Sequence, residues 1–185
     1  MRRISKLSLL FITILVLTTL NLSAAEKIMS KSVFGFYENI VLIPYGVKLK
    51  AKMDTGADTS SIHGEDINII EEEDKKFVKF HFEWEEDGKE KELDIKAPFV
   101  RFAYYEQKDE KDDEKRPVVL LTFCFDGKKY EDEFSIANRS GFSSPVLLGR
   151  SLMKKNGFVI DPKINYKADI NKCSNYLKDE KTDNK

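Results

Sequence analysis

The residues best suited to chemistry lie in the segment 52–60, which reads Lys-Met-Asp-Thr-Gly-Ala-Asp-Thr-Ser. The carboxylate of Asp54 can act as a base toward water only if it is ionised and lies beside a group that can return a proton. Two Asp side chains that share one proton meet this need, because like charges at hydrogen-bond distance cannot both ionise. No second Asp-Thr-Gly or Asp-Ser-Gly follows, since Asp126 lacks the middle hydroxyl residue and a proline follows Asp161. The second carboxylate must then come from another copy of the chain, which predicts a homodimer.

The Asp-Thr-Gly turn follows a stretch, residues 47–53, in which apolar side chains alternate with polar ones. Such alternation is typical of a β-strand with one buried face. A strand that runs into a tight turn would hold Asp54 at the end of a sheet. The alternative is an ordinary strand-to-loop turn, because Asp, Thr and Gly are all common turn residues.

Short alternating or apolar runs, separated by turn signals, dominate the rest of the chain. Residues 77–84 alternate cleanly, and Asp-Gly at 87–88 and at 126–127 predicts hairpin turns. The apolar runs 98–105 and 117–125 flank a charged stretch and predict the arms of a hairpin with a polar tip. Further strands are expected at 93–97, 130–137, 145–150 and 158–160, and one helix is expected at 151–156. The sequence therefore predicts an all-β fold, a small closed barrel with one short helix near the C-terminal end.

Both ends of the chain depart from this pattern. Residues 1–25 combine a positive start, an apolar run and a small-residue site, as a secretory signal peptide does. The apolar run is shorter than the roughly 20 residues of a spanning helix, so we expect cleavage after Ala25, no stable membrane anchor, and a periplasmic or secreted protein. Residues 171–185 form a charged tail that we expect to be disordered. Residues 26–170 remain as one domain.

Charge and cysteine content narrow the partners and the compartment. After residue 25, 28 of the 31 basic residues remain against 32 acidic ones, a formal charge of −4. Nucleic acid is a poor partner for such a surface. Cys124 and Cys173 would both reach an oxidising compartment, where a disulfide between them is allowed. The simpler expectation is that Cys124 is a small buried residue of a strand and that Cys173 belongs to the tail.

Two separated motifs resemble one family. The first is Asp-Thr-Gly-Ala-Asp at 54–58, and the second is Val-Leu-Leu-Gly-Arg at 146–150, about ninety residues later. Together they resemble the start and end signatures of retropepsin-like aspartic proteases. With Thr-Ser-Ser-Ile-His at 59–63 and Asn-Arg-Ser at 138–140, the chain resembles more narrowly a bacterial branch often labelled ATP-dependent zinc proteases. The resemblance covers roughly residues 40–162.

The resemblance implies an aspartic endopeptidase that acts as a homodimer. Asp54 of each subunit would hold the attacking water. Thr55 would bond across the two-fold axis, Gly56 would let the substrate backbone approach, and Ala57 would complete the supporting turn.

Asp58 and Arg150 match positions that, in the family, form a structural ion pair near the dimer contact. The implied substrate is a peptide or protein segment in extended form. Members of this branch are also found beside glutamate-ligase-type enzymes in some bacteria, which indicates peptide modification but identifies no target here.

No cofactor or metal is expected. A catalytic zinc site uses three protein ligands, often from a His-Glu-x-x-His helix, whereas this chain contains only His63 and His81 and lacks that spacing. His63 is interpreted as a polar loop residue and His81 as a residue on the outer face of a strand. A Gly-rich Lys-Ser/Thr loop for ATP phosphates is also missing from the sequence.

The expected flap keeps a rival interpretation open. Retropepsins close over the substrate with a glycine-rich hairpin, but the hairpin tip expected here, residues 104–116, contains no glycine. The alternative function is therefore a peptide-binding module with weak or no turnover on the same fold. A zinc peptidase is a third hypothesis.

Overall fold

Alternating sequence patterns become strands throughout the domain. The computed structural model describes residues 31–86, 88–105 and 114–177, and the account below concerns the unit formed from residue 33 onward. Its elements are β1 (Ser32–Phe34), β2 (Tyr37–Ile43), β3 (Val47–Asp54), β4 (Ser60–His63), β5 (Glu65–Glu72), β6 (Lys75–Glu86), β7 (Lys89–Tyr105), β8 (Glu114–Phe125), β9 (Lys128–Ala137), β10 (Val146–Gly149), α2 (Arg150–Asn156), β11 (Phe158–Ile160) and the 3-10 helix η1 (Ile170–Tyr176).

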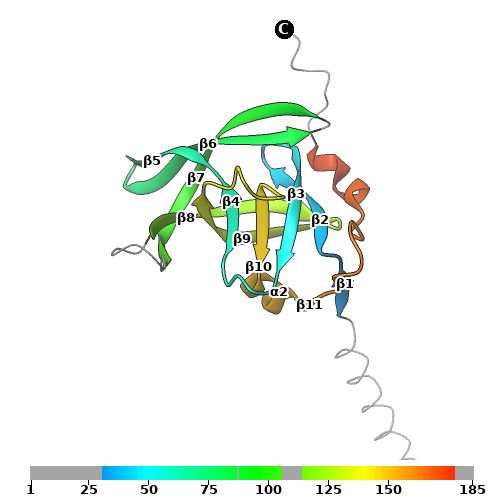
Figure 1. Cartoon of the computed structure of the whole chain (residues 1–185). Helices are drawn as coiled ribbons and strands as arrows, with labels where there is room; N and C mark the ends of the chain where they lie inside the picture. The colour runs from blue at the N-terminus through cyan, green and yellow to red at the C-terminus, as the bar shows by residue number, and fades with distance from the viewer. Residues whose placement is uncertain (1–30, 87, 106–113, 178–185) are drawn as a thin grey trace, which may run out of the picture. The chain divides into compact units, whose positions relative to one another are not determined.

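Six of these strands close into a barrel. The strand order is β2-β3-β10-β4-β9-β8, and β8 pairs back onto β2, so closure leaves no free edge among them. Figure 1 shows β10 between β3 and β4; it runs parallel to β3 and antiparallel to β4. The short helix α2 follows β10 directly and ends at Gly157, which adopts the left-handed conformation. The predicted all-β barrel with one short helix is confirmed.

The barrel interior is filled by the apolar face of each strand. Leu49, Ala51 and Met53 of β3 are buried, and so are Val146 and Leu148 of β10. Burial of apolar surface contributes roughly 25 cal/mol per Å². The strand that leads to Asp54 and the strand that precedes Arg150 are therefore both anchored in one core.

A second group of strands extends the sheet beyond the barrel. Residues 89–98 of β7 pair with β6, and residues 99–105 pair with β8, with a shift of register between Phe99 and Arg101. β5 pairs with β6 at the outer edge. We call β5, β6 and residues 89–98 the arm. The turn predicted at 87–88 is confirmed because Glu86 pairs with Lys89, whereas β4 and β5 were not predicted.

The C-terminal segment differs from the prediction. Cys124 of β8 and Cys173 of η1 form a disulfide, with their Cα atoms 5.8 Å apart, and both pack against Val41 of β2. The expectation of unpaired cysteines is wrong, and residues 171–177 belong to the packed domain because the bridge holds η1 against β2 and β8. Residues 178–185 and the predicted signal peptide lie outside the described residues.

A buried carboxylate provides a second tether for the same segment. Glu38 of β2 is fully buried and accepts hydrogen bonds from the backbone N–H groups of Gly35 at 2.5 Å, Lys167 at 3.1 Å and Ala168 at 2.9 Å. Backbone donors of this kind satisfy the oxygens of a buried carboxyl group.

No helix among residues 31–86, 88–105 and 114–177 has the length and apolarity needed to cross a membrane.

Candidate active site

Asp54 is the last residue of β3, and its side chain is 26% exposed. The N–H of Gly56 donates to Asp54 Oδ1 at 2.9 Å. A Cβ atom at Gly56 would lie 3.2 Å from the same Oδ1, so glycine leaves room for the carboxylate. Thr55 and Gly56 are both exposed. The turn therefore presents an accessible carboxylate in a fixed orientation.

The segment that follows β10 braces this turn from behind. The Arg150 N–H donates to the carbonyl of Ala57 at 2.7 Å. Its guanidinium donates to the carbonyl of Thr55 at 3.1 Å and to Asp58 Oδ1 at 2.7 Å. The structure thus brings Asp58 and Arg150 into contact, and the same arginine also holds two carbonyls of the turn.

Gly149 allows the two segments to approach closely. A Cβ atom there would lie 2.6 Å from the carbonyl carbon of Thr59 and 2.8 Å from the oxygen of Asp58. Ser60 Oγ accepts from the Gly149 N–H at 3.0 Å and donates to Asp132 Oδ2 at 2.7 Å. Burial raises the pKa of Asp132. This bridge links β4, β9 and β10, and β10 in turn pairs with β3 up to Asp54.

Sequence reasoning missed Asp132, although a signal was present. In the strand predicted at 130–137, Tyr130, Phe134 and Ile136 share one face, and Asp132 falls on that same face. A carboxylate on the apolar face of a strand needs a partner. The structure supplies that partner as the hydroxyl of Ser60.

Lys52 supplies the nearest positive charge to Asp54. Its Nζ lies 3.2 Å from Asp54 Oδ2, because residues two apart on a strand share a face. Burial raises the pKa of Asp54, but the Gly56 N–H, the Lys52 ammonium and the Ala57 N–H outweigh it, so this pKa lies below its ordinary value. In a single chain the Asp54 carboxylate is therefore ionised.

The two other aspartates considered from sequence are engaged elsewhere. Asp126 accepts from Lys172 Nζ at 2.8 Å and from the Asp169 N–H at 3.2 Å. Asp161 accepts from the Lys163 N–H at 2.9 Å. Both carboxylates have structural partners of their own, and neither is among the groups that bond to Asp54.

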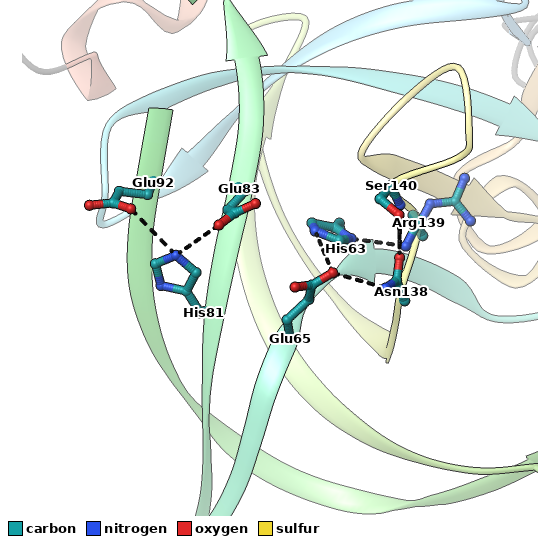
Figure 2. A network of polar contacts seen from close by, with 8 residues as sticks. All are labelled: His63, Glu65, His81, Glu83, Glu92, Asn138, Arg139 and Ser140. Atoms are coloured by element: carbon teal, nitrogen blue, oxygen red, sulfur yellow. Dashed lines mark hydrogen bonds and ion pairs between the residues drawn. The ribbon is translucent and has the colours of Figure 1, made fainter. Parts of the chain in front are cut away.

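A groove of about 1010 Å³ lies between the arm and the loop from β9 to β10. His63 of β4 lines it and is only 4% exposed, so its interpretation as a loop residue is wrong. Its Nδ1 accepts from the Arg139 N–H at 2.9 Å, as Figure 2 shows. Asn138 Nδ2 donates to Glu65 Oε1 at 2.9 Å, and Asn138 Oδ1 accepts from the N–H and hydroxyl of Ser140. The Asn-Arg-Ser motif therefore shapes one wall of the groove.

The environment of His63 favours the neutral imidazole. Burial lowers the pKa of His63 below its ordinary value of 6.5, although Glu65 and Glu83 act in the opposite direction. Because Nδ1 accepts a hydrogen bond, the proton of the neutral ring is on Nε2. The ring is therefore a hydrogen-bond acceptor for the 138–140 loop.

The predicted flap hairpin is present as the distal part of β7 paired with β8. At its base, Arg101 donates from Nε to Glu133 at 2.8 Å and from Nη2 to Thr59 Oγ1 at 3.3 Å. The first bond joins the hairpin to β9, and the second joins it to Thr59, in the segment between the Asp54 turn and β4. The polar tip, residues 106–113, lies outside the described residues.

Comparison with known proteins is consistent with this geometry. Over 134 residues the chain is 28% identical to proteins named "Probable alpha-L-glutamate ligase" from Shewanella pealeana and Shewanella halifaxensis. The match covers 72% of this chain and 29% of each relative, so the chain spans less than a third of their length. A crystal structure of a Legionella pneumophila protein of unknown function matches with a TM-score of 0.64 and 27% identity, over 76% of this chain and all of that one.

The family comparison agrees with the two motifs that frame the barrel. Residues 33–170 match the family described as "RimB-like: Retropepsin-like aspartic endopeptidase RimB". This stretch contains both the Asp54 turn and the Gly149-Arg150 segment that braces it. The chain therefore belongs to the RimB-like family of retropepsin-like aspartic endopeptidases.

Proposed function

We propose that this protein is an exported aspartic endopeptidase that acts as a homodimer on peptide or protein segments in extended form. The observation that carries the proposal is the Asp54 carboxylate, which is 26% exposed and fixed by the Gly56 N–H at 2.9 Å. This carboxylate lies beside Asp54 of a second copy when two copies of the chain pair through their turns. The family match and the ion pair of Asp58 with Arg150 support the same assignment.

The proposed reaction uses one proton shared by the two Asp54 carboxylates. The ionised carboxylate removes a proton from water, and the resulting nucleophile adds to the peptide carbonyl carbon. The protonated carboxylic acid donates a hydrogen bond to the carbonyl oxygen and then gives up its proton, which leaves a neutral tetrahedral diol. The Asp54 that took the water proton then gives it to the amide nitrogen while the other Asp54 carboxylate takes a proton from one diol hydroxyl. The C–N bond breaks, a carboxylic acid and an amine leave, and the enzyme again holds one shared proton.

Export is supported by the disulfide between Cys124 and Cys173. Structural disulfides persist in oxidising compartments and are rare in the cytosol of mesophiles. Together with the signal-like residues 1–25, this favours a periplasmic or secreted protein.

Apolar side chains fill the interior of the barrel. Substrate binding is therefore left to the outer surfaces beside the Asp54 turn, where an extended peptide can pair with strand edges.

The test is hydrolysis of an unfolded protein substrate at mildly acidic pH by wild type and by Asp54→Asn. Loss of acid–base catalysis predicts that the rate falls at least about 100-fold. Asp74→Asn is the matched control, because Asp74 lies in the exposed turn between β5 and β6 and should leave the rate unchanged. Equal cleavage by Asp54→Asn and wild type would eliminate the proposal. Sedimentation at several concentrations measures the dimer, and a chain that cleaves while monomeric would contradict the shared proton.

A peptide-binding module without turnover is the second candidate, and Lys52 favours it. Its ammonium, 3.2 Å from Asp54 Oδ2, neutralises the carboxylate and lowers the tendency to share a proton. In this case the protein would bind extended peptides and hydrolyse none of them. Robust hydrolysis that depends on Asp54 would rule the module out, whereas peptide binding without products would select it.

A further inference from the structure

One face of the β6–β7 hairpin gathers nitrogen and oxygen donors that are distant from Asp54 in sequence. Antiparallel register pairs His81 with Asp94 and Glu83 with Glu92. Since alternate residues of a strand point to the same side, these four side chains form two neighbouring rows on one face. Figure 2 shows the imidazole of His81 with its Nε2 directed at both Glu83 and Glu92.

The spacing of these donors suits a small divalent ion. His81 Nε2 lies 3.3 Å from Glu83 Oε1 and 3.6 Å from Glu92 Oε2, and the three ligand atoms all lie within 4.8 Å of one another. Two ligands that each lie about 2.0 Å from a tetrahedral zinc ion are about 3.3 Å apart. The separations of His81 Nε2 from the two carboxylates are therefore close to those that one ion would impose.

Asp94 orients the imidazole for this role. Its Oδ1 lies 2.9 Å from His81 Nδ1, so the proton of a neutral ring is on Nδ1 and the Nε2 lone pair faces the two carboxylates. A carboxylate that accepts from the second ring nitrogen is the usual outer partner of a metal-bound histidine. With a neutral ring and no bound cation, three acceptors would face one another: His81 Nε2 and the carboxylates of Glu83 and Glu92.

The negative charges along the hairpin also favour a bound cation. Glu83 lies directly opposite Glu92, and in the next row Glu85 lies directly opposite Glu90. Like charges directly opposite each other on antiparallel strands are destabilising. A proton on His81 or a bound metal ion would place positive charge at the centre of the three ligand atoms.

We propose that His81, Glu83 and Glu92 bind one zinc ion, with Asp94 as the positioning residue, and that the ion ties β6 to β7 within the arm. Imidazole favours zinc over magnesium or calcium, which prefer a shell of six or more oxygens. Three protein ligands leave a fourth position for water. Glu83 and Glu92 also line the groove of about 1010 Å³, so the fourth position is accessible from solvent.

The test is calorimetric titration of the full-length chain, stripped with EDTA, with zinc chloride. Wild type should bind one equivalent, and His81→Ala and Glu92→Gln should lose this binding. Glu90→Gln is the matched control, because it removes the same charge from the neighbouring row and should retain the full equivalent. Asp94→Asn should weaken binding about 10- to 100-fold, as outer partners of metal ligands do. Far-UV circular dichroism of each variant verifies that the fold is intact.

Two further variants separate this site from the remaining groups. His63→Ala removes the other histidine and Asp54→Asn removes the proposed catalytic carboxylate, and both should bind zinc as wild type does. Absence of stoichiometric zinc in wild type would overturn the proposal. Equal loss of binding in Glu90→Gln and Glu92→Gln would overturn it as well, because it would show diffuse attraction to an acidic surface.

Discussion

The Asp54 turn and the arm hold their carboxylates in opposite ways. At the turn, backbone groups add to the charges of Lys52 and Arg150: the Gly56 N–H bonds to the carboxylate, and the Arg150 N–H bonds to the carbonyl of Ala57. In the arm, exposed side chains face one another across the register of β6 and β7. The first arrangement combines charge with backbone bonds and close packing of the chain, and the second depends on side-chain charge. Substitutions should therefore cost far more at the turn than in the arm.

Gly149→Ala is the strongest test of this difference. A methyl group there would meet the carbonyl carbon of Thr59 at 2.6 Å, and backbone atoms cannot move aside as a flexible side chain can. We expect the free energy of unfolding to fall by about 3 kcal/mol, near the upper end for overpacking, as measured by urea denaturation.

Gly141→Ala is the matched control for this substitution. A Cβ atom at Gly141 would meet no atom within 4 Å among the described residues, so its stability should stay within about 0.5 kcal/mol of wild type. If both variants unfold at the same urea concentration, close packing at Gly149 does not hold the turn.

The same contrast explains what could be predicted from sequence. The Asp54 turn was predictable because its chemical groups are contiguous and follow an alternating strand. Asp132 and Lys52 were within reach, since each shares a strand face with residues already singled out. The hairpin turn predicted at 87–88 even fixes the register that pairs Glu83 with Glu92, although the two residues lie nine apart in sequence.

Other features could not be predicted because they depend on tertiary contacts. β5 carries no clean alternation, and its Ile67 and Ile69 are exposed, so a local pattern was missing. The 3-10 helix η1 is polar, and tertiary contacts place it in the domain: the pairing of Cys173 with Cys124 and the bond from Lys172 to Asp126. Closure of the barrel by β2 and β8 likewise joins strands that are far apart in the chain.

The two histidines extend the comparison to pH. Burial lowers the pKa of His63, whereas the hydrogen bond that His81 donates to Asp94 raises the pKa of His81. For His63 the unfolded chain binds more protons below its unfolded value of about 6.5, so stability should fall as pH drops through this range. For His81 the sign is opposite, and its contribution should be present at low pH and lost as pH rises above 6.5.

The measurement compares urea unfolding of His81→Asn and of the double variant His81→Asn/His63→Asn between pH 5 and 7.5, in EDTA. The single variant should lose stability toward pH 5 more steeply than the double variant, because the double variant has no buried imidazole to protonate. The carboxylates titrate in both proteins and cancel in the difference. Parallel curves would show that the buried His63 ring does not resist protonation.

The smallest expected effect belongs to the exposed rows of the arm. Glu90→Gln removes one of two like charges that lie directly opposite each other, since Glu90 faces Glu85. We expect a gain of about 0.5 kcal/mol in the free energy of unfolding, within the range for cross-strand pairs. Salt screens exposed charges, so the gain should shrink when urea unfolding is repeated in roughly 0.5 M sodium chloride, where the Debye length is about 4 Å.

Glu86→Gln is the control of opposite sign on the same hairpin. Glu86 accepts from Lys91 Nζ at 2.5 Å and lies 4.0 Å from Lys48 Nζ, so its loss removes attraction where the loss of Glu90 removes repulsion. This variant should be destabilised by roughly a few tenths of a kcal/mol, which is the range for ion pairs near the surface. Salt should reduce this effect too. If the two variants shift stability in the same direction, charge does not govern the arm, and its strands are held by packing as the Asp54 turn is.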